Sequence, residues 1–416
     1  MSEDPKGETP KLSQSKKLPP NVIWLGIASL FNDMSSEILL RALPLYLTGA
    51  LGVSTSIIGL IEGVAETTSS LLKVVFGWFS DKWRSRKNLA VSGYFLSAIA
   101  KPILLFTTSW LLPFVFRVID RIGKGVRTAP RDALIADSVT PELRGRAYGF
   151  NRALDPLGAM LGSLIAAGVL YGIGGFDKDP SAGLDSGVFR TFVIIAAIPT
   201  FLAVLLIVFF VHEKKKHARD AAAPVKISFT GMGRSFNIYL VILFVFSLGL
   251  SSDAFLLLRA KTVGISTAEI FLMITFFNLV TAVSAYPAGV LSDKLSRRTI
   301  ILIGWIYYAV LYIGFAYAET SLHIWILYVS YGLYYGLTEG VEKAFVADLV
   351  PKESRGTAFG LFNGVIGIAA LPASLVAGIL WQSYGDHAPF LFGGGLALLA
   401  SIMMLFFRAK KFEIHK

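Results

Sequence analysis

The stretch GWFSDKWRSRK at residues 77–87 decides the fold, because a shorter version of it, GVLSDKLSRR, returns at residues 289–298. The second copy begins 212 positions after the first. At the same spacing, GVST at residues 52–55 returns as GIST at residues 264–267. Repeated halves of roughly 200 apolar residues indicate a pseudo-symmetric membrane protein. They argue against a solenoid, whose repeats are tens of residues long.

The composition is that of a membrane protein. Hydrophobic residues make up 54% of the chain and charged residues only 16%, far from the usage of a soluble domain. The net charge of +11 is spread over short segments between apolar stretches, without interleaved aromatic residues, so no nucleic-acid partner is expected. The chain has no Cys, which excludes disulfides and cysteine metal sites, and it has no enzyme motif. We expect no enzymatic activity, cofactor or metal.

Apolar stretches of about 20 residues, the length that crosses roughly 30 Å of hydrocarbon, occur twelve times. We place them at residues 21–49, 56–79, 89–106, 111–136, 147–171, 188–211, 236–258, 268–291, 300–318, 323–349, 357–381 and 389–407. The prediction is an all-α polytopic membrane protein with twelve transmembrane helices in two pseudo-symmetric six-helix bundles. The bundles span residues 21–212 and 236–408, with a linker at 213–235 and tails at 1–20 and 409–416.

The distribution of Lys and Arg predicts the orientation. Nearly all basic residues of the connecting segments fall on one side, and only Lys178, Arg259 and Lys261 fall on the other. By the positive-inside rule, both termini are expected in the cytoplasm and the chain in the inner membrane. The first twenty residues are polar and show no cleavable signal peptide, so we expect a disordered tail there.

The repeated loop resembles the signature of the major facilitator superfamily, and the resemblance extends over essentially the whole chain. That family carries G-x-x-x-D-[RK]-x-G-[RK]-[RK] after its second and eighth helices; this chain departs from it at Arg84, Ser85 and Ser296. The resemblance implies a secondary transporter whose two bundles rock about a central site. It also implies a conformational latch at Gly77, Asp81, Lys82, Arg86, Gly289, Asp293, Lys294 and Arg298. The alternative is that the basic residues only anchor the topology.

The predicted fourth helix is unusually basic. Lipid exposure of five cations at about 3 kcal/mol each would cost on the order of 15 kcal/mol. Their spacing keeps them on one side of the helix, so they must line a wet cavity or pair with acids. They are Arg117, Arg121, Lys124, Arg127 and Arg131. The family resemblance links Arg121 to proton coupling; the alternative is a structural network with neighbours such as Asp120 or Asp132.

Acidic residues on other helices complete the predicted site. Asp33 and Glu37 lie on one stripe of the first helix, and Asp253 recurs in the seventh. A carboxylate partly removed from water can carry a proton near neutral pH, so Asp33 and Glu37 are candidate proton carriers. Permanent ion pairs to the fourth helix are the alternative. In the tenth helix, Glu339 and Glu342 are expected near the cavity, with Glu342 complementary to Arg131 across the repeat.

The fifth helix carries Gly149, Gly158, Gly162 and Ser163, which resemble the glycine-rich signature of the family's antiporters. The alternative for these small residues is close helix packing. Arg152 and Asp155 of the same helix are expected to pair with each other or with the latch region.

These observations favour a proton-coupled antiporter that exports a small organic solute, anionic or zwitterionic. The predicted substrate-binding residues are Arg127, Arg131, Lys124, Glu339 and Glu342, and the predicted proton-coupling residues are Asp33, Glu37 and Arg121. The expected partners are a small-molecule substrate, protons and the lipid bilayer, and the chain is expected to be a monomer. Two alternatives stay open: proton-coupled or facilitated uptake of an organic anion or siderophore, and a non-transporting sensor or lipid-handling protein.

Overall fold

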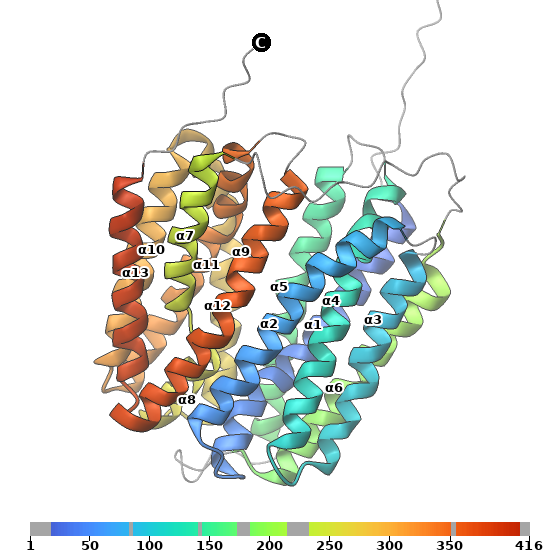
Figure 1. The fold of residues 1–416 in the computed structure, drawn as a ribbon. Helices are drawn as coiled ribbons and strands as arrows, with labels where there is room; N and C mark the ends of the chain where they lie inside the picture. The colour runs from blue at the N-terminus through green and yellow to red at the C-terminus, as the bar shows by residue number, and fades with distance from the viewer. Residues whose placement is uncertain are drawn as a thin grey trace, which may run out of the picture.

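The computed structural model describes residues 18–82, 86–139, 144–172, 184–213, 233–350 and 355–407. Within these ranges every regular element is helical (Figure 1). The predicted tails at 1–20 and 409–416 and the linker at 213–235 lie almost entirely outside the described residues.

The first half of the chain forms six long helices and one short 3₁₀ segment. They are α1 (Pro20–Gly49), α2 (Thr55–Lys82), α3 (Arg86–Ala100), η1 (Lys101–Phe106), α4 (Leu111–Ser138), α5 (Arg144–Gly172) and α6 (Ser186–Phe210). The second half forms α7 (Arg234–Leu248), α8 (Ala254–Thr262), α9 (Thr267–Lys294), α10 (Arg297–Ala316), α11 (Ser321–Leu349), α12 (Arg355–Tyr384) and α13 (Ala388–Phe406).

Two predicted spans are interrupted. The predicted span at 89–106 consists of α3 followed by η1, and the one at 236–258 is broken into α7 and α8. The break falls at residues 249–253, where the hydroxyl of Tyr308 donates to the Gly249 carbonyl at 3.0 Å. With each interrupted pair counted as one span, the described helices correspond to the twelve predicted ones.

The repeat seen in the sequence returns in the backbone. Gly52 follows α1 with a φ of 61°, and Gly264, 212 positions later, follows α8 with a φ of 90°. Both values lie in the left-handed region that glycine tolerates without a steric penalty. The two halves therefore make the same turn at the same repeat position.

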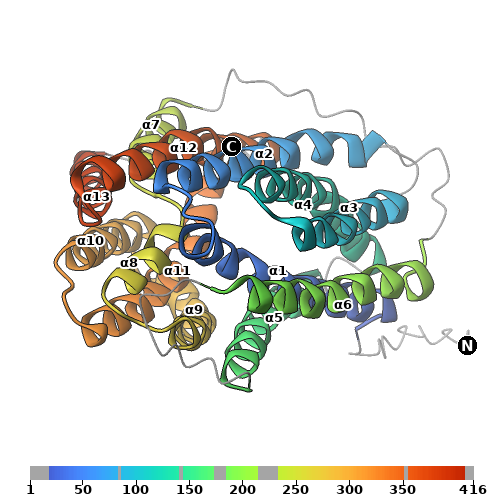
Figure 2. The same cartoon turned by 90° about the horizontal axis from the view of Figure 1, so that it is seen from below.

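Most helices of α1–α6 pack mainly on one another, as do most of α7–α13, whereas α2 and α12 make their most extensive contact with each other; Figures 1 and 2 show the two groups side by side. The groups meet chiefly where α2 runs along α12 and where α5 runs along α9, while α1 touches α8 near the centre (Figure 2). Helix α1 begins and α13 ends at the same end of the molecule (Figure 1), which we call the terminal face. The opposite end is the far face.

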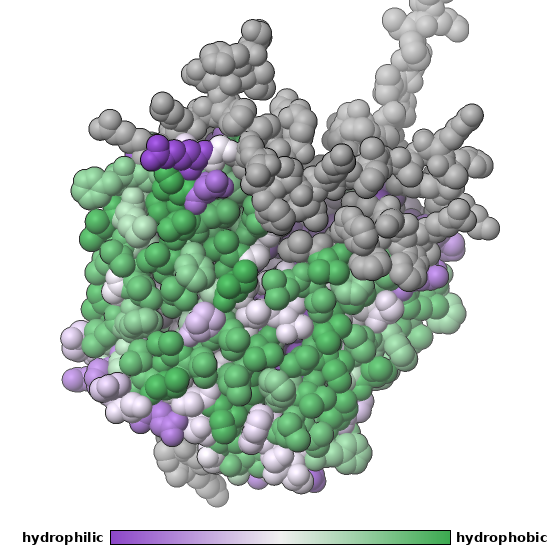
Figure 3. Space-filling view, viewed as in Figure 1, coloured by the Kyte–Doolittle hydropathy of each residue, from purple (hydrophilic) through white to green (hydrophobic). Residues whose placement is uncertain are grey.

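The face of the molecule seen in Figure 3 is largely hydrophobic over both groups of helices. Among the described residues, seven helices are by themselves long and apolar enough to cross a membrane. The long helices that miss this standard are α1, α2, α4 and α11, and each of them carries charges along its length. Because charged side chains facing lipid are costly, these four helices must turn their charges inward.

Candidate functional site

Most cations of α4 are already paired with carboxylates. Arg117 is 2% exposed and forms a two-pronged ion pair with Glu62 of α2, with its Nε donating to Oε1 at 3.0 Å. Arg121 lies 3.9 Å from Glu66, also on α2. These two pairs tie α4 to α2 and neutralise two of the five basic residues.

Arg131 is also held by acids. Its Nε donates to Asp132 at 3.0 Å, and its Nη1 lies 3.9 Å from Asp155 of α5. The same Nη1 donates to the hydroxyl of Ser29 on α1 at 2.7 Å, and Ser29 donates to Asp155 at 2.7 Å. Arg131 therefore joins α1, α4 and α5.

Lys124 and Arg127 differ from the other α4 cations. Among the described residues, neither has a carboxylate within ion-pair distance. Arg127 is 6% exposed; it donates to the Ser97 hydroxyl at 2.7 Å and lies over the Tyr94 ring at 4.9 Å. Lys124 is half-buried. These two residues leave positive charge uncompensated in the middle of α4.

The acidic stripe of α1 divides in the same way. Glu37 accepts from Arg41 at 2.9 Å, and Arg41 reaches across to Asp253, at the start of α8, at 3.2 Å. Asp33 accepts only a hydrogen bond from Asn32 at 3.2 Å, and no cation of the described residues lies within ion-pair distance of it. Of the two predicted proton carriers, Asp33 is the one without a permanent partner.

Asp33 nevertheless lies within electrostatic reach of the basic residues. It interacts with Lys124, Arg127 and Arg131 of α4 and with the carboxylate of Asp155. The unpaired acid and the unpaired cations thus face the same region.

The acids of α11 have separate roles. Glu339 binds Lys343 at 3.0 Å and also pairs with Arg152 of α5, so the latter contact joins the two groups of helices. Glu342 accepts from the indole nitrogen of Trp305 at 2.8 Å. Arg131 and Glu342 were predicted to have complementary charges across the repeat. They do not contact each other in this conformation, because each binds residues of its own half.

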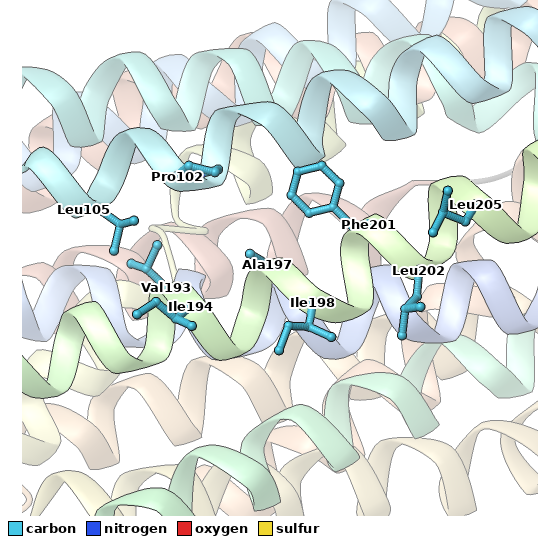
Figure 4. A pocket seen from close by; sticks show the side chains of 9 residues that line it. All are labelled: Pro102, Leu105, Val193, Ile194, Ala197, Ile198, Phe201, Leu202 and Leu205. Carbon is cyan, nitrogen blue, oxygen red and sulfur yellow. The ribbon is translucent and has the colours of Figure 1, made fainter.

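A lipid-facing groove lies apart from these charges. It occupies about 450 Å³ between η1 and α6 (Figure 4). Its lining is apolar throughout: Pro102, Leu105, Val193, Ile194, Ala197, Ile198, Phe201, Leu202 and Leu205. With no polar side chain to orient a solute, the groove suits lipid acyl chains and is distinct from the charged site.

The chain is similar to known proteins over nearly its whole length. Residues 25–259 and 240–416 match the Major Facilitator Superfamily. An uncharacterized MFS-type transporter of Methanocaldococcus jannaschii is 36% identical over 398 residues, which cover 94% of this chain and 96% of that protein. The chain belongs to the Major Facilitator Superfamily.

Other members of the superfamily extend the comparison. The multi-drug resistance efflux pump PmrA homolog of Lactococcus lactis is 24% identical over 407 residues, covering 94% of this chain and 95% of that one. The crystal structure of a D-xylose-proton symporter superposes with a TM-score of 0.74 at 14% identity, covering 94% and 99% of the two chains. The predicted family and fold are confirmed: this Major Facilitator Superfamily protein is an integral membrane transporter with two related sets of helices.

The superfamily latch falls partly outside the described structure. The side chains of Gly77, Asp81, Lys82, Gly289, Asp293 and Lys294 are not described. Arg86 donates to Asp137 of α4 at 2.6 Å, and Arg298 donates to the Met404 carbonyl of α13 at 3.0 Å. Both contacts stay within one half of the molecule, so they show the loop bases anchoring neighbouring helices.

The fifth-helix predictions have mixed outcomes. Gly158 and Gly162 press against the backbone of α1, which is the close-packing alternative, although this does not test the antiporter resemblance. Arg152 and Asp155 were expected to pair with each other or with the latch region; the described residues show no pair between the two, and the latch side chains lie outside the described residues. Each instead binds another helix, α11 for Arg152 and α1 with α4 for Asp155.

Two interior lysines were not among the predicted site residues. Lys73 of α2 is half-buried and, among the described residues, has no ion-pair partner. Lys101, the first residue of η1, is fully buried. Both stand in apolar stretches, and the signal that could have found them is the cost of a lone charge inside a predicted span.

Proposed function

We propose that this transporter moves a small organic anion and that the anion and a proton bind together. The supporting observation is the charge imbalance around α4: within the described part of the chain, Lys124 and Arg127 lack carboxylate partners and Asp33 lacks a cation. An anionic solute would supply the missing negative charge. Lys124 contacts the solute, and the buried Arg127 attracts it electrostatically without touching it. The remaining cations of α4 hold the helices together through their ion pairs: Arg117, Arg121 and Arg131.

The sign of the coupling follows from electrostatics. Ionised Asp33 interacts with the same cations that would bind the anion, so the carboxylate and the solute compete for them. A proton on Asp33 removes that competition and strengthens anion binding, and by reciprocity the bound anion strengthens proton binding. Cooperative binding of an anion and a proton is the signature of a symporter, which would use an inward proton gradient for uptake.

Export by antiport is the second candidate. Relatives named multi-drug resistance efflux pumps support it, as does the glycine pattern of the fifth helix. In an antiporter a cationic or zwitterionic solute would bind ionised Asp33 and be displaced by the proton. The two candidates therefore differ in the sign of the linkage between the solute and the proton.

The proposed location is the cytoplasmic membrane, with the terminal face in the cytoplasm. The described bases Arg86, Lys87, Arg234, Arg297 and Arg298 stand at helix ends next to connections on that face. Retention of basic loops in the cytoplasm then sets the orientation.

A thermal-stability screen of the purified chain tests the substrate class. Organic anions, siderophores and lipophilic cations are compared at about pH 6 and about pH 8. A ligand at about 100 times its dissociation constant stabilises the folded state by about 2.7 kcal/mol. We expect anions to stabilise the protein more at the lower pH, and Lys124→Ala to abolish the effect while Lys261→Ala, on the far face, leaves it intact. Larger stabilisation by cations at the higher pH would replace the symport proposal with the antiport candidate.

Transport in liposomes then tests the role of Asp33. With the anion found in the screen, Asp33→Asn should retain exchange of labelled for unlabelled solute and lose accumulation driven by a pH gradient. Exchange needs no net proton movement, so it separates coupling from binding. Full accumulation by the variant would remove Asp33 from the mechanism.

A further inference from the structure

Lys101 is a buried charge-bearing group that the proposed solute site does not use. It begins η1 and is 0% exposed. The neighbouring Pro102 lines the lipid-facing groove (Figure 4). The lysine side chain instead contacts Ser35 of α1 and Thr200 of α6. A lysine inside a membrane-spanning segment is costly, which makes a functional role the default hypothesis.

The hydrogen bonds of Lys101 are fewer than an ammonium needs. Its Nζ donates to the hydroxyls of Ser35 on α1 and Thr200 on α6. Both hydroxyls in turn donate hydrogen bonds to the Ala196 carbonyl. An ammonium has three N–H donors, so two acceptors satisfy a neutral amine but leave one donor of the ammonium without a partner. An unpaired buried donor carries the full cost of its lost hydration.

A buried acceptor that lacks a hydrogen-bond donor lies on α4. Asp120 is 3% exposed, and its Oδ1 has no hydrogen-bond partner. Asp120 and Lys101 interact electrostatically, although they are not within ion-pair distance of each other. The remaining charged groups acting on Lys101 are Arg127 of α4 and Asp33 of α1, while α6 contributes only the polar groups of Thr200 and Ala196.

We propose that Lys101 and Asp120 form a second proton-binding site, buried among the helices of the first half and separate from the solute site. The exchangeable proton is the third hydrogen of the Lys101 ammonium. When it leaves, its bonding electron pair stays on Nζ and the amine keeps both hydroxyl partners. Asp120 remains ionised beside Arg117, Arg121 and Arg127, where its negative charge stabilises the ammonium, and the released proton passes to water.

This site would link protonation to the shape of the first half, because Lys101 touches α1 through Ser35 at the level of the acidic stripe. Asp33 stands two residues before Ser35 on the same helix. A change of charge at Lys101 would therefore alter the position of α1, and with it the position of Asp33 at the solute site. The proposal does not depend on the identity or direction of the solute.

Solid-state ¹⁵N NMR of the full chain labelled at lysine Nζ tests the proposal with the proton itself as the ligand. Ammonium and neutral amine give separate resonances. Exposed lysines stay charged between about pH 6 and about pH 9 because their ordinary pKa is about 10.4. The other interior lysines, Lys73 and Lys124, are assigned through Lys73→Met and Lys124→Met. We expect a further resonance, belonging to neither, to move from the ammonium to the amine position within that range. It should be absent from Lys101→Met and unchanged in Lys261→Met.

Two further variants keep the test decisive if Lys101→Met does not fold. Thr200→Val removes one acceptor and should shift the same resonance, and Asp120→Asn should change its pH dependence. If all lysine resonances stay at the ammonium position up to about pH 9, the proposal is overturned, and Lys101 is a permanently charged residue that only connects α1 and α6. The proposal would also be overturned if every moving resonance survived in Lys101→Met, or if the resonance lost in Lys101→Met did not respond to Thr200→Val or Asp120→Asn.

Discussion

At the scale of single residues, the described interior charges divide into those held in ion pairs and those without an ion-pair partner, to which the proposed function assigns the solute and the proton. Arg117 and Glu62 illustrate the first kind, because they are 2% and 12% exposed and bind only each other strongly. Arg117→Leu would leave Glu62 as an uncompensated buried charge, and we expect a loss of about 3–5 kcal/mol. The double variant Arg117→Leu with Glu62→Leu should recover most of it. Thermal denaturation of the single and double variants checks this, and equal losses in both would show that the pair acts through packing alone.

The same residues show how far the sequence could predict the site. The basic stripe of α4 and the acids of α1 follow from helical spacing and the cost of charge in lipid. Which cation is neutralised depends on neighbours that are distant in the chain, as with Glu62, 55 positions before Arg117. No local pattern reveals that partner. Lys101 was missed for a related reason, since a single lysine in an apolar run gives no periodic signal.

At the scale of helices, the spans could be predicted because hydrophobic length is set by membrane thickness, but their interruptions could not. The break between α7 and α8 lies in the run LGLSSD, the most polar part of that span, but polarity alone does not predict a break, because α4 carries more charge and continues unbroken. Its geometry depends on Tyr308 of α10 reaching the Gly249 carbonyl. That contact joins residues far apart in the chain, so a hydropathy profile cannot predict it.

Helix α5 allows a matched test of helix packing. A Cβ on Gly158 would overlap the Leu30 carbonyl of α1, whereas a Cβ on Gly168 would meet nothing within 4 Å. Gly158→Ala should therefore destabilise the protein by roughly 1–3 kcal/mol through overpacking. Gly168→Ala should be neutral or stabilising by up to about 1 kcal/mol, the gain in helix propensity. Melting temperatures of the two variants give the comparison; similar shifts would mean that α1 and α5 adjust freely.

At the scale of the whole molecule, the two halves are joined at the far face by contacts that transport must break. Thr55 donates to the Gly378 carbonyl at 3.2 Å, and Ser56 donates to Gln382 at 2.6 Å, both between α2 and α12. The ion pair of Arg41 with Asp253 lies further inside, between α1 and α8. Rocking of one half against the other would separate all three contacts.

The Arg41–Asp253 pair has a special position in the repeat. Its members are 212 positions apart, which is also the spacing of Gly52 and Gly264 and of the repeated loops. Residues at equivalent positions of two related halves can touch only near the axis that relates them. A pair on that axis changes its separation whenever the halves tilt, so its attraction acts directly on closure of the far face.

Loss of this pair should therefore loosen the far face without unfolding either half. The chain contains no Cys, so Ser56→Cys with Gln382→Cys gives a thiol pair that a short crosslinker joins only when the far face is closed. Adding Arg41→Gln or Asp253→Asn should lower the crosslinked fraction, and the exchange Arg41→Asp with Asp253→Arg should restore much of it. Asn21→Cys with Ser138→Cys, a pair within the first half, is the control and should not respond. Unchanged crosslinking in both single variants would assign closure of the far face to the packing of α2 against α12, with the axial ion pair serving only to neutralise its own charges.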